Sequence, residues 1–138
     1  MIKYPRIVFI GTTDFAVKSL KKLIELNYLI SLVITIPDKF YKNKLIESSV
    51  KKIALLYRLP ILQPKNLKDT TFLNELKSYK ADLQIVVDFR MLPKKVWSLP
   101  ILGTFNLHAS LLPQYRGAAP IQWAIINGET ETGLTTFF

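Results

Sequence analysis

Two side chains near the end of the chain could move an acyl group. Asn106 and His108, the only histidine, lie two residues apart in a stretch typical of a strand, and strand alternation would point both side chains to one face. The Asn106 amide can donate to a developing oxyanion, an interaction worth about 3 kcal/mol when it is aimed at the transition state. Histidine is the residue type that can take or give a proton near neutral pH, which makes His108 a candidate for proton transfer. The alternative interpretation is a histidine that only fills the core and is hydrogen-bonded there.

The residues after His108 predict a shaped loop, because Leu-Leu-Pro at 111–113 and Arg116-Gly117 interrupt the strand pattern. Arg116 could hold an anionic group. Pro120 fits the first residue of a helix over 120–126. The candidate residues thus lie at the point where a strand gives way to a loop.

The elements that must position these residues follow from the hydrophobic pattern, in which short apolar runs alternate with amphipathic segments. Strands are expected over 6–11, 30–36, 60–64, 82–87, 104–108 and 133–138, and helices from 14 onward and over 48–57, 69–79, 94–99 and 120–126. This order predicts an α/β fold, an open and doubly wound sheet that is mostly parallel and carries helices on both faces.

In such sheets ligands bind beyond the carboxyl ends of the strands. Asp88–Pro93 follows one expected strand and Asn106–Pro113 follows another, so both segments are expected on one rim. The first turn, Gly11-Thr12-Thr13-Asp14, lacks the second and third glycines of a dinucleotide fingerprint, and its aspartate would repel an anion. The sequence therefore argues for a site on this rim and against dinucleotide binding.

Composition bounds the class of protein. A chain of 138 residues can form one domain, and none of its apolar runs approaches the roughly 20 residues of a membrane span or forms a signal peptide. The lack of cysteine excludes disulfides, thiolate metal sites and a cysteine nucleophile, and we expect a cytoplasmic protein. The formal charge of +9 favours anionic partners, nucleic acid first, although a lysine-rich genome would give the same excess.

A basic stretch follows Pro37-Asp38. Lys39, Lys42 and Lys44 surround two aromatic residues, Phe40 and Tyr41, a combination that could grip a phosphate backbone and stack on a base. The alternative is an ordinary solvated loop.

Over nearly all its residues the sequence resembles the formyltransferase domain of the methionyl-tRNA formyltransferase family. The Asn-X-His-X-Ser-Leu-Leu-Pro core at 106–113 is shared by enzymes that use 10-formyltetrahydrofolate, and Arg-Gly-Ala-Ala-Pro-Ile at 116–121 favours the tRNA enzyme over glycinamide ribonucleotide and nucleotide-sugar formyltransferases. The other matching segments are Gly11-Thr12, Asp14-Phe15-Ala16, Pro37-Asp38, Val50-Lys51, Gln63-Pro64, Gly128-Glu129 and Glu131-Thr132-Gly133.

The resemblance implies transfer of a formyl group from 10-formyltetrahydrofolate to the amino group of methionyl-initiator tRNA, by a monomer that needs no metal. Asn106 would stabilise the oxyanion and His108 would assist proton transfer. The residues expected at the folate are Ser110, Leu111, Leu112, Pro113, Phe89, Arg90, Met91 and Leu92. The residues expected at the tRNA are Lys39, Lys42, Lys44 and Arg116.

The sequence departs from the family in three places. The chain stops at Phe138, before the family's catalytic aspartate and its C-terminal tRNA-binding domain, so residues 1–138 are expected to be a partial formyltransferase domain with little or no activity alone. The basic stretch at 39–45 is shorter than in the family and lacks glycine. Asp88 puts a carboxylate where the family has a small or apolar residue, and the sequence assigns it no role.

The truncation leaves alternatives open. The chain is a fragment, a truncated gene product or a trimmed sequence, and the whole is an enzyme or an inactive remnant that binds folate or RNA. Another domain that uses 10-formyltetrahydrofolate, a transferase or a hydrolase, is the remaining possibility, and the stretch at 116–121 argues against it.

Overall fold

The computed structural model describes residues 4–108 and 135–137. Strands and helices alternate along this part of the chain, as the hydrophobic pattern predicts. The elements are β1 (Arg6–Gly11), α1 (Asp14–Glu25), β2 (Leu29–Ile34), β3 (Lys39–Tyr41), β4 (Lys44–Ile46), α2 (Ser49–Leu56), β5 (Ile61–Leu62), α3 (Thr70–Ser78), β6 (Leu83–Val87), α4 (Lys94–Trp97), β7 (Thr104–His108) and β8 (Thr135–Phe137).

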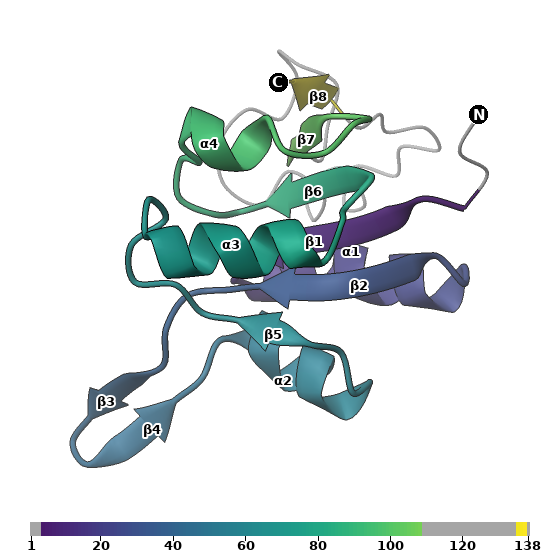
Figure 1. Ribbon diagram of the computed structural model, residues 1–138. Helices are drawn as coiled ribbons and strands as arrows, with labels where there is room; N and C mark the ends of the chain where they lie inside the picture. The colour runs from purple at the N-terminus through teal and green to yellow at the C-terminus, as the bar shows by residue number, and fades with distance from the viewer. Residues whose placement is uncertain (1–3, 109–134, 138) are drawn as a thin grey trace.

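The main sheet has the strand order β5-β2-β1-β6-β7-β8 (Figure 1). All neighbouring strands from β5 to β7 run parallel, and β8 pairs antiparallel with β7. The strand order reverses at β1, because the chain builds outward to β2 and β5 and then returns to β6 on the other side. The structure therefore confirms the predicted α/β class with a mostly parallel, doubly wound sheet.

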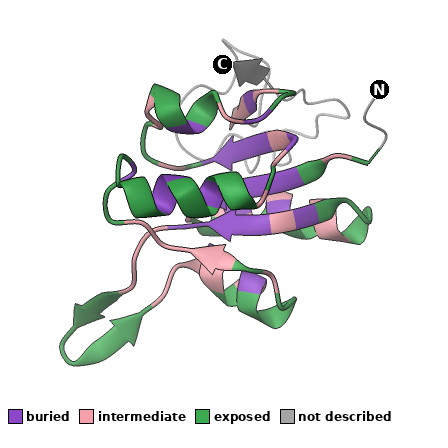
Figure 2. Ribbon diagram, viewed as in Figure 1, coloured by how far each residue is buried: buried purple, intermediate pink, exposed green. Residues whose placement is uncertain are grey.

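Alternate residues of β1 enter opposite faces of the sheet. Ile7 and Phe9 join a core with α1 and α2, whereas Val8 and Ile10 join a second core with α3 and α4. Figure 2 shows the central strands as buried and the outer surfaces of the helices as exposed. Burial on both faces explains why the strands read as continuous apolar runs.

The three longer helices begin at capped positions. Thr13, Ser48 and Asp69 precede α1, α2 and α3, and each side chain accepts a hydrogen bond from the backbone N–H three residues later. Such caps satisfy backbone donors that the first helical turn leaves open, and each contributes about 1 kcal/mol.

Gly11 ends β1 where the first turn packs closely against β6. A Cβ at this position would lie 2.7 Å from the carbonyl oxygen of Val87 and 2.8 Å from the Cβ of Ala16. Both distances are shorter than a carbon atom tolerates. The close approach of the strands and α1 therefore requires glycine here.

The amino ends of β1 and β6 are joined by an ion pair. The backbone N–H of Arg6 donates to Asp82 Oδ2 at 2.8 Å, and the Arg6 guanidinium lies 3.3 Å from the same oxygen. These hydrogen bonds, the backbone one foremost, lower the pKa of the Asp82 carboxyl below its ordinary value. The ionised carboxylate thereby stabilises the pairing of two strands that are far apart in the sequence.

The basic stretch at 39–45, predicted as a loop, folds as an antiparallel hairpin. Lys39 pairs with Ile46 and Tyr41 pairs with Lys44. The two turn residues, Lys42 and Asn43, both have positive φ, 49° and 63°, which is the backbone of a type I′ turn. The hairpin projects away from the sheet beyond β2 and β5 (Figure 1).

One expected strand is shorter in the structure, and one expected helix falls on residues that the structure does not describe. The strand expected over 60–64 shortens to Ile61–Leu62 between two prolines, which cannot donate to a ladder. The helix expected over 120–126 lies outside the described residues. Within the described ranges, no helix combines the length and the apolar character that crossing a membrane demands.

Candidate functional site

A cavity of about 420 Å³ opens beside β7, where the chain leaves the carboxyl end of β6. Its walls include Asn106 and the segment 89–92 that follows β6; the remaining lining residues are Trp97 and Thr104. Asn106 enters this rim because it pairs with Val86, one residue before the end of β6. The structure thus brings together the two segments that the sequence placed on one rim, in a volume ordinary for a ligand site.

A polar network supports β7 directly beneath Asn106. Thr104 Oγ1 lies 2.7 Å from the carbonyl oxygen of Trp97 and 3.0 Å from Oε1 of the fully buried Gln84. A hydroxyl has one proton, which the Trp97 carbonyl accepts. Exchanging the two Gln84 amide atoms lets Nε2, otherwise without a partner among the described residues, donate to Thr104 Oγ1. The network then ties the strand that carries Asn106 to β6 and to the end of α4.

Asp88, which has no role assigned from the sequence, connects two turns of the rim. Its backbone has a positive φ of 57°, and its Oδ2 accepts a hydrogen bond from Thr13 Oγ1 at 2.7 Å. Thr13 is also the cap of α1. Asp88 therefore fixes the departure of the chain from β6, and with it the start of the segment 89–92.

Arg90 holds the same segment from its other side. Its guanidinium donates to the carbonyl oxygens of Lys65, at 2.9 Å, and Pro64, and its Cζ lies 5.2 Å from the centroid of the Phe89 ring. These bonds engage the Arg90 side chain with the loop after β5. The backbone and the apolar side chains of 89–92 consequently remain the parts that can meet a ligand.

A second cavity, of about 880 Å³, adjoins the first and shares Arg90, Met91 and Leu92 with it. Four lysines line this cavity and no carboxylate does; they are Lys65, Lys68, Lys94 and Lys95. These lysines are not among the residues predicted from the sequence. The position of Lys94 and Lys95 directly after Pro93, on the predicted rim, is the signal that could have indicated them. The adjoining cavity suits an anionic group of a ligand that lies against 89–92.

A third cavity, of about 830 Å³, lies on the face of the sheet beside α1. Its walls come mainly from apolar side chains of β1, β6, β7 and α1, with Ser19 and the lysines 18 and 22 among them. Neither Asn106 nor the segment 89–92, the two parts of the predicted rim, belongs to its lining. The rim at Asn106 is therefore the candidate site.

The predicted tRNA lysines lie elsewhere. Lys39, Lys42 and Lys44 are exposed on the β3–β4 hairpin, and the Lys42 ammonium lies 5.4 Å from the centroid of the Tyr41 ring. Phe40 and Tyr41 are 79% and 62% exposed. The structure does not bring these lysines to the Asn106 cavity, since the hairpin leaves the sheet at its β5 side (Figure 1).

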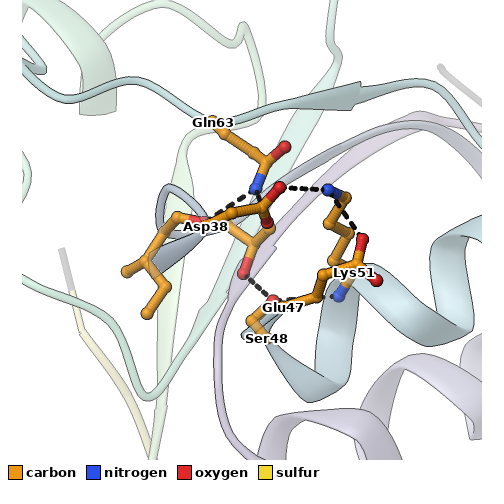
Figure 3. Close-up of polar contacts among 7 residues, drawn as sticks. Asp38, Glu47, Ser48, Lys51 and Gln63 are labelled. Atoms are coloured by element: carbon orange, nitrogen blue, oxygen red, sulfur yellow. Dashed lines mark hydrogen bonds and ion pairs between the residues drawn. The ribbon is translucent and has the colours of Figure 1, made fainter. Parts of the chain in front are cut away.

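Three of the short matching segments of the sequence meet at the base of the hairpin (Figure 3). Lys51 Nζ donates to Asp38 Oδ2 at 2.6 Å and to Glu47 Oε2 at 2.8 Å, and Gln63 Nε2 donates to Asp38 Oδ1 at 2.8 Å. The hydrogen bonds from Lys51 and then Gln63 lower the pKa of Asp38, and those to Asp38 and then Glu47 raise the pKa of Lys51. Each shift favours the charged form of the group.

The other predicted site residues are described only in part or not at all. His108 belongs to β7, where it pairs with Thr135, so its backbone follows Asn106 along the same strand. Ser110, Leu111, Leu112, Pro113 and Arg116 lie outside the described residues. The catalytic and binding roles of all these residues stay predictions. Among the residues that the structure describes, no three His, Cys, Asp or Glu side chains are grouped to hold a metal ion.

Comparison with known proteins gives the family context of this rim. A model of the formyl transferase family matches residues 5–138. The chain is 62% identical to the methionyl-tRNA formyltransferases of Parabacteroides distasonis, over 136 residues, and Bacteroides thetaiotaomicron, over 135 residues. Each match covers 96% of this chain and 42% of the relative, so the chain spans about two fifths of the length of these curated relatives.

Solved structures resemble the fold at much lower identity. The phosphoribosylglycinamide formyltransferase of Brucella melitensis matches with a TM-score of 0.65 and 18% identity, over 99% of this chain and 73% of that one. The enzyme of the same name from Bacillus halodurans matches with a TM-score of 0.64 and 16% identity, over 96% and 71%. These likenesses bear on the fold alone.

Proposed function

This chain belongs to the formyl transferase family, and we propose that it forms part of an enzyme that transfers a formyl group from 10-formyltetrahydrofolate to the amino group of methionyl-initiator tRNA. The observation that carries the proposal is the cavity in which Asn106 faces the segment 89–92. The choice of acceptor is supported by the 62% identity to methionyl-tRNA formyltransferases. The same proposal includes a cytoplasmic location and a monomeric enzyme.

The cavity walls fit a reduced folate. Phe89, Met91, Leu92 and Trp97 offer apolar surface for a flat ring, and backbone groups of 89–92 can read its polar edge. A folate also ends in glutamate carboxylates, which the lysines of the adjoining cavity would attract. The residues at 110–113 complete this proposed folate site.

The chemistry assigned to Asn106 is stabilisation of charge. When the acceptor amine attacks the formyl carbon, a C–N bond forms, and negative charge develops on the formyl oxygen. The Asn106 amide N–H donates to that oxygen, and the polar network under β7 holds the strand so that the donor is aimed in advance. His108 accepts the proton that the amine loses. It supplies a proton to the departing folate nitrogen as the bond between that nitrogen and the formyl carbon breaks.

The tRNA is proposed to meet the basic hairpin. Lys39, Lys42 and Lys44 supply exposed positive charge, and Phe40 and Tyr41 supply faces on which bases can stack. Arg116 is the fourth proposed contact.

Titration of a reduced folate against the chain tests the cofactor site. We expect saturable binding by the wild-type chain, and weaker binding when Lys94 and Lys95 are replaced together by glutamine. Replacement of Lys21 and Lys22, exposed on α1, by glutamine removes the same charge and is the control. No binding by the folded wild-type chain would contradict the proposal.

Formyl transfer tests the reaction itself. The 138-residue chain is assayed beside the full-length enzyme of Bacteroides thetaiotaomicron, and little or no turnover by the chain alone is expected. In a protein with turnover, Asn106→Ala should lower kcat by roughly 100- to 1000-fold while folate binding persists. An Asn106→Ala enzyme with normal kcat would remove Asn106 from the mechanism, and folate binding without turnover in any form of the protein would favour a folate-binding remnant.

Binding of initiator tRNA as a function of salt tests the hairpin. Replacing Lys39, Lys42 and Lys44 by glutamine should weaken binding and reduce the salt slope by about 0.7–0.9 for each phosphate that is no longer neutralised. The control replaces Lys18, Lys21 and Lys22 of α1, which removes the same charge from another surface. An unchanged slope in the hairpin variant would make the hairpin an ordinary surface.

A further inference from the structure

The β3–β4 hairpin has no hydrophobic core of its own. Every residue from 39 to 46 is exposed, and the hairpin stands clear of the sheet in Figures 1 and 2. The residues that flank it, Asp38 and Glu47, are the first on either side to be partly buried. The direction in which the hairpin points must therefore be set at its base.

One ammonium group connects the two ends of this base. Lys51 Nζ lies 2.6 Å from Oδ2 of Asp38, the residue before β3, and 2.8 Å from Oε2 of Glu47, the residue after β4. The Lys51 side chain is only 14% exposed. In Figure 3 it lies between the two carboxylates and bonds to both.

The same base is joined to the packed body of the protein. Gln63, after β5, donates to Asp38 Oδ1 and to the carbonyl oxygen of Ile36, and the hydroxyls of Thr35 and Ser48 are 2.6 Å apart. Lys51 itself belongs to α2, whose Val50 and Ala54 are fully buried in the core. The hairpin is thus anchored to α2, which packs on the core, and to the residue that follows β5.

We propose that Lys51 is a positioning residue, which fixes the direction of the β3–β4 hairpin so that its lysines and aromatic rings are presented together to RNA. The proposal rests on the proposed function for its ligand, a tRNA, and on the contacts at the hairpin base for its mechanism. Without the ammonium, two carboxylates would face each other at a partly buried site with no cation between them. Like charges repel there, so the base should open and the hairpin should sample many directions.

A fixed hairpin matters because ordering a mobile segment at the moment of binding costs affinity. The cations of Lys39, Lys42 and Lys44 would still be present in a chain that lacks Lys51. They would no longer be held in one arrangement. Loss of Lys51 should therefore weaken RNA binding although Lys51 does not contact the RNA.

The first arm of the test measures hairpin direction without any ligand. The chain contains no cysteine, so nitroxide labels can be placed on Leu45→Cys in the hairpin and Asn74→Cys on α3, both exposed in the wild type. Spin–spin distances should be narrowly distributed in the otherwise wild-type chain and broad in Lys51→Met. Lys51→Arg, whose guanidinium can still bond to both carboxylates, should restore the narrow distribution. Lys52→Met removes the same charge from an exposed neighbour on α2 and should leave it narrow.

The second arm measures affinity for initiator tRNA in the unlabelled variants. Lys51→Met should bind about five- to tenfold more weakly, whereas Lys51→Arg and Lys52→Met should stay within about twofold of wild type. A narrow distance distribution in folded Lys51→Met would overturn the proposal, and so would a broad one with unchanged affinity. If the wild-type chain did not bind tRNA, the proposed function would lose its RNA contact and the assignment of RNA to the hairpin would fall with it. The distances would still show whether Lys51 fixes the hairpin.

Discussion

The Asn106 cavity adjoins the carboxyl end of β6, the β3–β4 hairpin follows the carboxyl end of β2, and the two regions are held by different forces. Asn106 sits in a parallel strand whose neighbour, β6, is almost wholly buried. The hairpin residues are all exposed, and its anchorage is a group of ion pairs and hydrogen bonds at its base. Packing of buried strands, with the neutral hydrogen bonds of Thr104 among them, thus fixes the proposed chemical centre, while ion pairs at the hairpin base aim the proposed RNA contact.

Because the forces differ, different perturbations should affect the two regions. Close packing of a core makes its geometry sensitive to volume and insensitive to salt and pH. Polar anchorage responds in the opposite way, because the energies of ion pairs depend on protonation and on screening. The two regions can therefore be disturbed one at a time.

A matched pair of phenylalanine truncations gives the largest contrast. Phe9 is fully buried in β1 and Phe40 is 79% exposed in the hairpin. Phe9→Ala should lower the free energy of unfolding by about 3–5 kcal/mol, the cost of a large core truncation, whereas Phe40→Ala should change it by less than about 0.5 kcal/mol. Urea denaturation of both variants measures this. Comparable losses in the two would mean that the hairpin packs against the body.

Gly11→Ala should disturb the rim without touching the hairpin. The new Cβ would meet the Val87 carbonyl oxygen and the Ala16 side chain at 2.7 and 2.8 Å, so β1, β6 or α1 must shift. Overpacking of this kind costs about 1–3 kcal/mol, again measured as a loss in the free energy of unfolding. Folate binding should weaken as well, because the shift reaches the end of β6. Spin-label distances from the hairpin to α3 should not change, and a change there would break the separation of the two regions.

Thr13→Val should loosen the rim more gently. It removes the cap of α1 together with the hydrogen bond to Asp88, and a lost cap costs about 1 kcal/mol. Thr12→Val is the control, since Thr12 Oγ1 is buried without a partner among the described residues, and it should be neutral or slightly stabilising. Thermal unfolding of the two variants distinguishes them. Equal effects would mean that the Asp88 hydrogen bond and the cap contribute nothing.

Acidification should separate the hairpin base from the body of the sheet, with the smallest energies. Asp38 and Asp82 both have pKa values below the ordinary 3.8 in the folded chain, so at a pH between the folded and the unfolded pKa of each group the unfolded chain binds more protons. Their stabilisation is present above about pH 4 and is lost as the pH falls through the folded pKa values. Hydrogen exchange should report the loss of Asp38 at the hairpin base, while global unfolding reports the loss of Asp82.

Substitution by asparagine tests this assignment. Asp82→Asn should flatten the acid dependence of global unfolding, and Asp38→Asn should flatten only that of the hairpin. The reverse result would contradict the division into two regions. Lys51, whose pKa is raised, should keep its contribution until the pH rises through that higher pKa.

The sequence predicts the core of this molecule better than the hairpin, because burial leaves a periodic pattern in the sequence and exposure does not. The buried strands and the alternation of elements follow from periodicity, and the expected helix starts at 48 and 69 agree with the observed α2 and α3 to within one residue. The rim site follows too, because the carboxyl ends of parallel strands share an edge. The hairpin does not follow, because all its positions are exposed and leave no alternation to read, and because Lys42-Asn43 lacks the glycine that marks most type I′ turns.

Long-range polar contacts are the other part that the sequence does not reveal. Asp88 finds its partner at Thr13, and Lys51 finds Asp38 and Glu47, only after the elements between them have packed. Resemblance to the family indicates that Asp38, Lys51 and Gln63 matter. It does not indicate that they touch.

The central place of β1 in the sheet has a consequence for how the chain folds as it is synthesised. Its pairing with β2 joins neighbours along the chain, Arg6 with Leu29, and can form as soon as β2 has left the ribosome. Its other edge must wait for β6, since Ile7 pairs with Leu83. Until then a long apolar strand stays open on one side and is a hazard for aggregation. The late closure of β1 by β6, with Asp82 meeting Arg6, should therefore be the step that commits the nascent chain to its fold.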